Sequence, residues 1–502
     1  MNPIPTRAAT MAKTSAMSMA RSTVMNTATT APGAQGAMTR PHDEPTTLAR
    51  QTEQETLDVC DTVLRRALDK GATQAEVWGE HAVSTNASLE QNELKGAATA
   101  EHAAFGIRVI TGTGADARVG FCYVNRKDSA SLNEAIDDAL AIARASSPDE
   151  ANDLVDPRPV RPIGGLLDRR VVALSADDAV GLAARMLQAA RDIDARVSID
   201  SGYVAVAHGT VALATSRGIR LADTDSSILW GLFGMAVDGD DVGSFENVSE
   251  AVRDFDAIDV EASGREFAQR ALSLLKPRAG RSFTGPAIFS PAAFDEVFLA
   301  ALSASVDGDA VRKGKSRLKD KLGARIAARG FTLVDDGTLP GGNGSAPFDR
   351  EGLPHRRTVL VGDGVLHHFV YDGRAAKRAG RPPTGHAEGS ARTLPGVGLT
   401  NVRLQPGTLD DDALLATLGS GLWIGRFSGD VDEVSGDFSG VAKASFAVKG
   451  GRRAWPVQET LIAGNVFDLL PRVVERGANL RRLVTVDCPP VLVDGLKVTA
   501  GP

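Results

Sequence analysis

Apolar side chains early in the chain recur at the spacing of an amphipathic helix. The repeat begins after Glu53 and consists of Leu57, Cys60, Leu64 and Leu68. Residues three and four positions apart lie on one face of a helix, so this stripe predicts a helix that packs on a core. Gly71 follows where a helix C-cap belongs.

A different spacing follows, and it predicts strands. Residues 75–83 are rich in strand-forming side chains, and 104–110 and 117–124 flank a glycine-rich turn, which predicts a hairpin. Residues 197–238 contain short apolar runs separated by turn-forming pairs. The predicted turns are His208-Gly209, Ser216-Arg217-Gly218 and Asp238-Gly239, and the pattern is typical of an antiparallel meander.

Three further helices are predicted in the first half. Ser131-x-x-Glu134 and Ser175-x-x-Asp178 both fit a capping box, in which two side chains satisfy free backbone N–H groups at a helix start. A third apolar pattern covers roughly 258–275 and ends before Pro277, a residue that cannot continue a helix.

Together these elements predict an α+β protein. We expect residues 1–50 to be a disordered leader, 51–276 an N-terminal helix-and-sheet domain, and 277–502 a β-rich C-terminal domain. The leader has no acidic residue before Asp43, so a transit peptide is an alternative interpretation. The boundary is placed at Pro277–Gly285, where helix, proline and glycine meet.

Composition narrows the function classes. A net charge of −7 argues against general nucleic-acid binding, because such proteins normally carry a basic face. The three cysteines, Cys60, Cys122 and Cys488, are far apart in sequence, which favours a reducing cytoplasm over a disulfide framework. No apolar run is long enough to predict a membrane span.

Two glycine-rich segments could contact a partner or a peptide. Gly341, Gly342, Asn343 and Gly344 form one, because closely spaced glycines allow a backbone to approach another chain. Asp437 and Ser439 belong to the other. The alternative is structural: a tight loop between strands in the first case, and side chains that cap their own turns in the second.

Four of the eight histidines fall within 355–386 and could form a metal site: His355, His367, His368 and His386. Because His367 and His368 are adjacent, a strand would point them to opposite faces, so only one could join His355 and His386. Surface and hairpin histidines are the competing interpretation.

Several blocks, in this order, resemble the TldD/PmbA family, the group once called modulators of DNA gyrase. They are GIRV (106–109), RVGF (118–121), TLVDDGTLPGGNGSAPFDREG (332–352), RRTVLVGDGVL (356–366), PTGHA (383–387), SGDFSG (435–440) and PVQETLIAGNVFDLL (456–470). Each block is weak alone, but their order covers roughly residues 55–502.

The resemblance implies a division of labour between two kinds of subunit. TldD-type chains resemble zinc peptidases with HExxxH on a helix and a later cysteine ligand, whereas PmbA-type chains, also called TldE, lack these ligands. Laid on that pattern, the two histidine positions fall on Leu299 and Ala304 and the glutamate position on Ala300. The cysteine position falls near Leu480–Val484, and Cys488 belongs to the segment after it.

The function implied is a PmbA/TldE-like subunit of a cytoplasmic, TldD-type metallopeptidase. Such a subunit binds no zinc itself, pairs with a TldD-like zinc peptidase, and completes the chamber in which unfolded protein or peptide is cleaved. Two alternatives stay open. The chain could be a metallopeptidase with a relocated site at His355, His367 and His386, or a non-enzymatic homodimeric binding protein.

Overall fold

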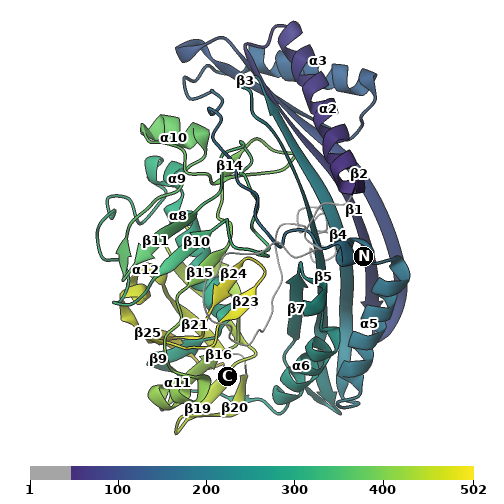
Figure 1. Cartoon of the computed structure of the whole chain (residues 1–502). Helices are drawn as coiled ribbons and strands as arrows, with labels where there is room; N and C mark the ends of the chain where they lie inside the picture. Colours follow the sequence, from purple (N-terminus) through teal and green to yellow (C-terminus); the bar gives the residue numbers. More distant parts are fainter. Residues whose placement is uncertain (1–46, 459, 502) are drawn as a thin grey trace, which may run out of the picture.

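The computed structural model describes residues 47–458 and 460–501 and divides into two parts (Figure 1). One part is a long, curved sheet with helices on its outer face. The other, formed by the second half of the chain, packs against the opposite face of that sheet at one end. The α+β class expected from the sequence is confirmed.

Within the described residues, the first part is an antiparallel sheet with the strand order β3-β2-β1-β4-β5-β6, and β7 also pairs with β5. The strands are β1 (Gln74–Glu90), β2 (Glu93–Thr111), β3 (Arg118–Val124), β4 (Val197–Thr215), β5 (Arg220–Asp238), β6 (Asp241–Val242) and β7 (Glu246–Val252). The predicted hairpin is confirmed, with Ile107 opposite Cys122.

The turn predicted at His208-Gly209 is wrong, because both residues lie inside β4. His208 pairs with Val83 on one side and Ser226 on the other. The alternation of buried side chains continues through it, from Val204 and Val206 to Thr210 and Ala212. Hydrogen bonding to a strand on each side keeps the backbone extended where the local residues alone favour a turn.

Helices cover one face of the first sheet. They are α2 (Thr47–Asp69), α3 (Ser129–Ala145), α4 (Arg169–Val172), α5 (Ala176–Arg191) and α6 (Val260–Ser273), with short 3₁₀ turns η2 (Gly114–Asp116) and η3 (Phe255–Ala257). Along β1, Val77 and Leu89 contribute to the cores beneath these helices. Glu76 and Trp78 alternate with them and face the second part, as expected for a strand.

The two predicted capping boxes have different outcomes. That of Ser175 and Asp178 is confirmed, since each side chain accepts the backbone N–H of the other. The helix predicted at Ser131 begins earlier, because Asp128 is the N-cap and its carboxylate accepts the N–H of Ser131 at 2.9 Å. A carboxylate is stabilised at a helix N-terminus by the helix dipole, and here it replaces the serine.

The chain passes from α6 to the second part through β8. Its larger, mixed sheet has the order β17-β18-β21-β25-β9-β16-β19-β20-β8, with β22 paired to β25. These strands are β8 (Arg278–Ala279), β9 (Phe283–Phe289), β16 (Gly421–Ile424), β17 (Arg426–Val431), β18 (Asp437–Lys443), β19 (Phe446–Lys449), β20 (Arg452–Gln458), β21 (Thr460–Asn465), β22 (Val473–Arg476) and β25 (Val491–Thr499).

A smaller sheet of order β12-β11-β10-β15-β24-β23 and a β13-β14 pair complete the strands described in this part. They are β10 (Leu333–Asp336), β11 (Arg357–Gly362), β12 (Val365–Leu366), β13 (Ala387–Glu388), β14 (Gly396–Val397), β15 (Val402–Leu404), β23 (Arg481–Leu483) and β24 (Val486–Cys488). The helical segments are α7 (Pro291–Phe294), the π-helical turn η4 (Asp295–Leu299), α8 (Ala300–Val306), α9 (Gly308–Arg312), α10 (Gly373–Ala379), α11 (Asp411–Leu418), α12 (Val466–Leu469) and η5 (Leu470–Arg472).

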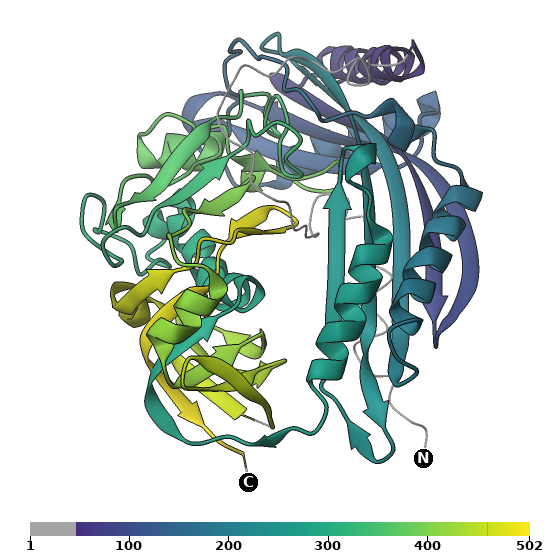
Figure 2. The same cartoon turned by 60° about the horizontal axis from the view of Figure 1, so that its bottom comes forward.

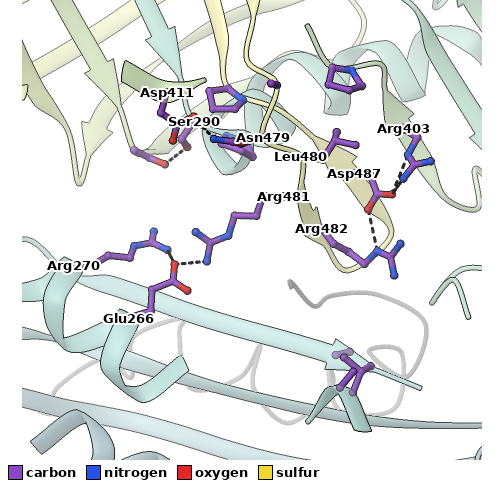
Figure 3. Close-up of a pocket in the computed structure, with 18 of the residues that line it drawn as sticks. Glu266, Arg270, Ser290, Arg403, Asp411, Asn479, Leu480, Arg481, Arg482 and Asp487 are labelled. Carbon is purple, nitrogen blue, oxygen red and sulfur yellow. Dashed lines mark hydrogen bonds and ion pairs between the residues drawn. The ribbon is translucent and has the colours of Figure 1, made fainter. Parts of the chain in front are cut away.

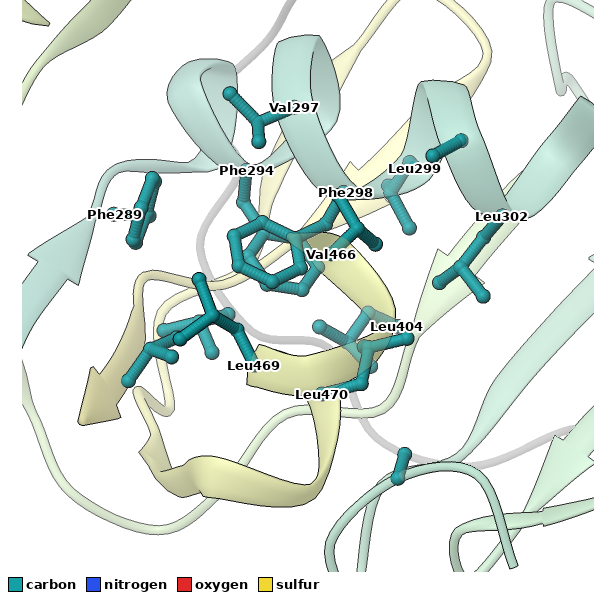
Figure 4. Packing of buried hydrophobic residues seen from close by; sticks show 14 of the residues in the cluster. Phe289, Phe294, Val297, Phe298, Leu299, Leu302, Leu404, Val466, Leu469 and Leu470 are labelled. Atoms are coloured by element: carbon teal, nitrogen blue, oxygen red, sulfur yellow. The ribbon is translucent and has the colours of Figure 1, made fainter. Parts of the chain in front are cut away.

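The continuous helical segment α7-η4-α8 lies in the core of the second part (Figure 4). The rings of Phe294 and Phe298 stack with centroids 4.5 Å apart, and both are fully buried. Val466 and Leu469 of α12 belong to the same core. This segment is therefore fixed by packing along most of its length.

A buried network of four charged side chains joins the two parts. Glu76 on β1 accepts hydrogen bonds from Arg108 on β2 at 2.5 Å and from Arg350 at 2.8 Å. Arg108 also reaches Glu351 at 3.2 Å, and the Arg350 guanidinium lies 4.6 Å from the Trp78 ring centroid. Burial raises the pKa of Glu76, but the two guanidinium groups outweigh it and hold that pKa below its usual value.

Replacing Arg350 by methionine should destabilise the protein by about 3–5 kcal/mol, because one side of Glu76 would lose its buried partner. The urea midpoint of unfolding measures this change. Arg220→Met is the matched control. Its pair with Asp61 is partly exposed, so its loss should cost less than about 1 kcal/mol. Equal costs for the two substitutions would contradict the role given to the network.

Candidate functional site

A cavity of about 1490 Å³ lies between the two parts. One wall is formed by β7 and α6 of the first part. The opposite wall comes from the start of α7, from β16, β19 and β20, and from the hairpin β23-β24. Figure 2 shows the two walls opposite each other. It is much larger than two further cavities of about 390 and 410 Å³, and we treat it as the candidate site.

The glycine-rich loop singled out in the sequence closes one end of this cavity. Arg253, a buried residue, donates to the carbonyl of Gly342 at 3.2 Å and to that of Asn343 at 2.9 Å. Asn343 in turn donates from its side chain to the Val484 carbonyl at 2.9 Å. Gly341 lines the cavity. Through these hydrogen bonds the loop joins the residue that follows β7 to the turn of the hairpin β23-β24.

Close packing explains two of these glycines. A Cβ on Gly344 would lie 2.3 Å from the Thr400 carbonyl oxygen, and one on Gly342 would lie 2.7 Å from Ser345 Oγ. Gly341 differs, since its φ is +63° and a Cβ there would meet its nearest atom at 3.7 Å. Gly342 and Gly344 therefore serve packing, while Gly341 provides a left-handed turn at the cavity surface.

The second predicted segment lies elsewhere. Asp437 and Ser439 are exposed residues on β18 and are not among the residues that line the cavity. Asp437 accepts hydrogen bonds from Asn465 at 2.8 Å and from Ser435 at 2.9 Å. The structure thus separates these two residues from Gly341, and contact with a peptide or partner stays a prediction for both groups.

Charged side chains from both parts meet across the cavity (Figure 3). Glu266 on α6 pairs with Arg481 of β23 at 2.5 Å and with Arg270 at 3.2 Å. On the other wall, Asp487 pairs with Arg403 and with Arg482, each at 3.0 Å. The Arg481–Glu266 pair therefore connects the hairpin of one wall to the helix of the opposite wall.

A buried carboxyl group lies next to this wall. Glu250 on β7 is 4% exposed, and its burial raises its pKa to about 8, with Glu266 adding to the rise. Arg481 and a hydrogen bond from Ser263 oppose the rise. Ser263 also accepts the indole N–H of Trp230 at 2.8 Å. Burial therefore favours the neutral form of the Glu250 carboxyl well above the pH at which an exposed glutamate ionises.

The positions that the sequence aligned with HExxxH lie on η4 and α8. Leu299 is 1% exposed and belongs to the core, whereas Ala300 and Ala304 are half-buried. A leucine and two alanines offer no metal-ligand atom and no group that can take a proton. The segment Leu480–Val484, aligned with the cysteine ligand, includes β23, and its first three residues line the cavity.

Cys488 does not supply the missing thiolate. It is fully buried at the end of β24, and burial raises the pKa of its thiol well above the ordinary value. A nucleophilic or metal-binding cysteine needs the thiolate form, which this environment disfavours.

The histidines of the alternative metal site have separate partners. His355 donates from Nδ1 to the Gly385 carbonyl at 2.8 Å, and the Nε2 of buried His386 lies 3.1 Å from an Asp335 oxygen. His367 is exposed. Within residues 47–458 and 460–501, no group of three His, Cys, Asp or Glu side chains is arranged to hold a metal ion. The same part of the chain has no helix with the length and apolarity needed to cross a bilayer.

The sequence alone does not identify the arginines that line the cavity. Arg253, Arg270 and Arg481 lie apart from one another in sequence and match no motif, so only the fold brings them together around the cavity. Arg481 does lie in the segment aligned with the cysteine ligand. Its neighbourhood was therefore indicated although its role was not.

Comparison with known proteins covers most of the chain. Family models described as PmbA/TldA metallopeptidase domain 1, central domain and C-terminal domain match residues 75–143, 169–275 and 282–500. The chain is 28% identical over 459 residues to "Metalloprotease PmbA" of Escherichia coli O157:H7, covering 84% of this chain and 95% of that protein.

The chain is also similar to a relative that is named after TldD. "Metalloprotease TldD homolog" of Buchnera aphidicola is 22% identical over 450 residues, covering 86% of this chain and 89% of that protein. Among solved structures, TldE from Thermococcus kodakarensis has the same fold, with a TM-score of 0.81 at 24% identity. The match covers 88% of this chain and 100% of that one.

Gly344→Ala should destabilise the protein by roughly 3 kcal/mol, the upper end of overpacking costs, because the backbone at Thr400 must move. Gly341→Ala is the matched variant, and left-handed backbone strain alone should cost it about 1 kcal/mol. Urea unfolding of the two variants checks this order. The reverse order would show that loop conformation matters more than close packing.

Glu250→Gln should change how stability depends on pH. The folded pKa of about 8 lies above the ordinary value of 4.5, so the contribution of Glu250 is full below pH 4.5 and is lost as pH rises through 8. A glutamine cannot ionise, so the variant should match the parent below about pH 4.5, gain on it as pH rises from there, and exceed it by a constant amount above pH 8. Urea midpoints across this range measure the difference. Glu261→Gln, at a more exposed position on α6, should leave the profile unchanged.

Proposed function

The chain belongs to the PmbA/TldD metallopeptidase family, and we propose that it is the TldE-like subunit of a two-chain zinc peptidase. In this proposal it holds no zinc and completes the chamber around the active site of a TldD-like partner. The substrate is an unfolded protein or a peptide, and the assembly acts in the cytoplasm.

The observation that carries the proposal is the character of the helical segment at Leu299, Ala300 and Ala304. The Leu299 side chain fills core space between η4 and its neighbours, so a histidine there would remove apolar packing as well as change the chemistry. No ligand atom or general base stands at the three positions that a zinc peptidase of this family would need.

Two further observations support this proposal. The higher identity is with the relative named PmbA, 28% against 22% for the relative named TldD homolog. The cavity between the two parts is large enough for an extended segment of several residues, and most of the arginines on its walls are paired with carboxylates. A chain of this kind can hold a substrate and leave the bond cleavage to a partner.

Purified alone, the chain should contain far less than one zinc per molecule and cleave no unfolded peptide. Co-expressed with an HExxxH-bearing relative from the same genome, it should elute with that relative as one complex that cleaves the peptide until a chelator is added. Elemental analysis, size-exclusion chromatography and a peptide-cleavage assay measure the three quantities.

A matched pair of substitutions shows which of the two chains carries out the cleavage. Changing the glutamate of the partner's HExxxH to glutamine should abolish cleavage by the complex. Ala300→Gln, at the aligned position of this chain, should leave the rate unchanged. Metal-dependent cleavage by this chain alone would overturn the proposal. Stoichiometric zinc that disappears when His355, His367 and His386 are replaced would favour a relocated metal site, and a homodimer that ignores the partner would favour a binding protein.

A further inference from the structure

One arginine of the cavity differs from the others in its electrostatic surroundings. Of the seven that line the cavity, six form ion pairs with carboxylates: Arg170, Arg253, Arg270, Arg403, Arg481 and Arg482. Arg453 is the seventh, and no carboxylate within the described residues lies at ion-pair distance from it. Its guanidinium group therefore has no direct counter-ion among these residues.

Aromatic rings hold the Arg453 side chain in place. Its Cζ lies 3.6 Å from the ring centroid of Trp423 on β16 and 5.8 Å from that of Phe446 on β19. Trp423 is 6% exposed and packs with Leu414 and Leu418 of α11, so the surface beneath the guanidinium is rigid. Trp423 and Phe446 are also directly opposite each other on paired strands.

Stacking uses one face of the guanidinium and leaves its edge available. A guanidinium edge has N–H donors in a fixed fork that matches the two oxygens of a carboxylate. Arg453 is an exposed residue that lines the cavity, so such a carboxylate can approach from within it. The stacking alone accounts for where the side chain lies, but it does not compensate the charge.

The acidic residues nearest to Arg453 do not form an ion pair with it. Asp411 and Asp412 at the start of α11 act on Arg453 only as more distant charges. Asp411 also accepts a hydrogen bond from Asn479 at 3.3 Å, on the cavity surface (Figure 3). Their field moderates the positive potential without supplying a direct partner. An anionic ligand that takes the edge of Arg453 would complete the pair.

We propose that Arg453, stacked on Trp423, binds a carboxylate of the peptide held in the cavity. The inference rests on the proposed function and adds a substrate class to it, namely peptides with an anionic end or side chain. A free C-terminus and an Asp or Glu side chain both carry this group, and the experiment below distinguishes them.

Three fluorescein-labelled peptides of one unstructured sequence test the idea by fluorescence anisotropy with the full-length chain. One has a free C-terminus, the second a C-terminal amide, and the third the amide with a single internal glutamate. We expect the first to bind at least tenfold more tightly than the second. Arg453→Gln should remove that difference, and Arg453→Lys should restore only part of it, because lysine keeps the charge but not the fork.

Arg452→Gln is the control, because Arg452 is an exposed neighbour on the same strand but does not line the cavity. It should bind the three peptides as the parent does. If the third peptide also binds tightly, acidic side chains are accepted as well as the C-terminus. Equal binding of acid and amide would overturn the inference while the proposed function stands. Failure of every peptide to bind, in parent and variants alike, would overturn both.

Discussion

Glu76 and Arg108 lie opposite each other on adjacent strands of the first sheet, and Arg350 and Glu351 reach them from a loop of the second part. All four are nearly inaccessible to water. Removing charges from water costs several kcal/mol for each ion, so the arrangement is stable only when every partner is in place. A shift of one part against the other would leave a buried charge unpaired. This requirement holds the two parts in one relative position, and the cavity between them depends on it.

Much of the first part could be predicted from its sequence because its signals are local. The stripe from Leu57 to Leu68 and the capping box of Ser175 report backbone preferences that the fold obeys. The misplaced turn at His208-Gly209 shows the limit, since strand pairing on both sides overrode a local preference. The early start of α3 has a similar cause, because Asp128 competes with Ser131 as the cap.

The site was less predictable because its parts are joined only by tertiary contacts. The glycines at 341–344 stand out in sequence, but the residue that fixes their backbone, Arg253, is ninety positions away and fits no motif. The positions at which the family pattern has its zinc ligands and general base could be located by resemblance, and they are Leu299, Ala300 and Ala304 in this chain. The unpaired state of Arg453 could not, because it depends on where every neighbouring carboxylate lies.

The division of the sheets along the chain has a consequence for how the protein is made. Strands β1–β7 all end by Val252, whereas the larger sheet begins at Arg278, so a ribosome delivers the first sheet whole before the second exists. Within the first sheet alone, Glu76 and Arg108 are opposite each other and lie beside the apolar surface of Trp78 and Leu213. The pair keeps this surface partly polar until the loop carrying Arg350 emerges. Because the lining of the cavity includes residues as late as Pro490, the cavity closes only when almost the whole chain has been made, and until then the second part cannot cover this charged face of the sheet.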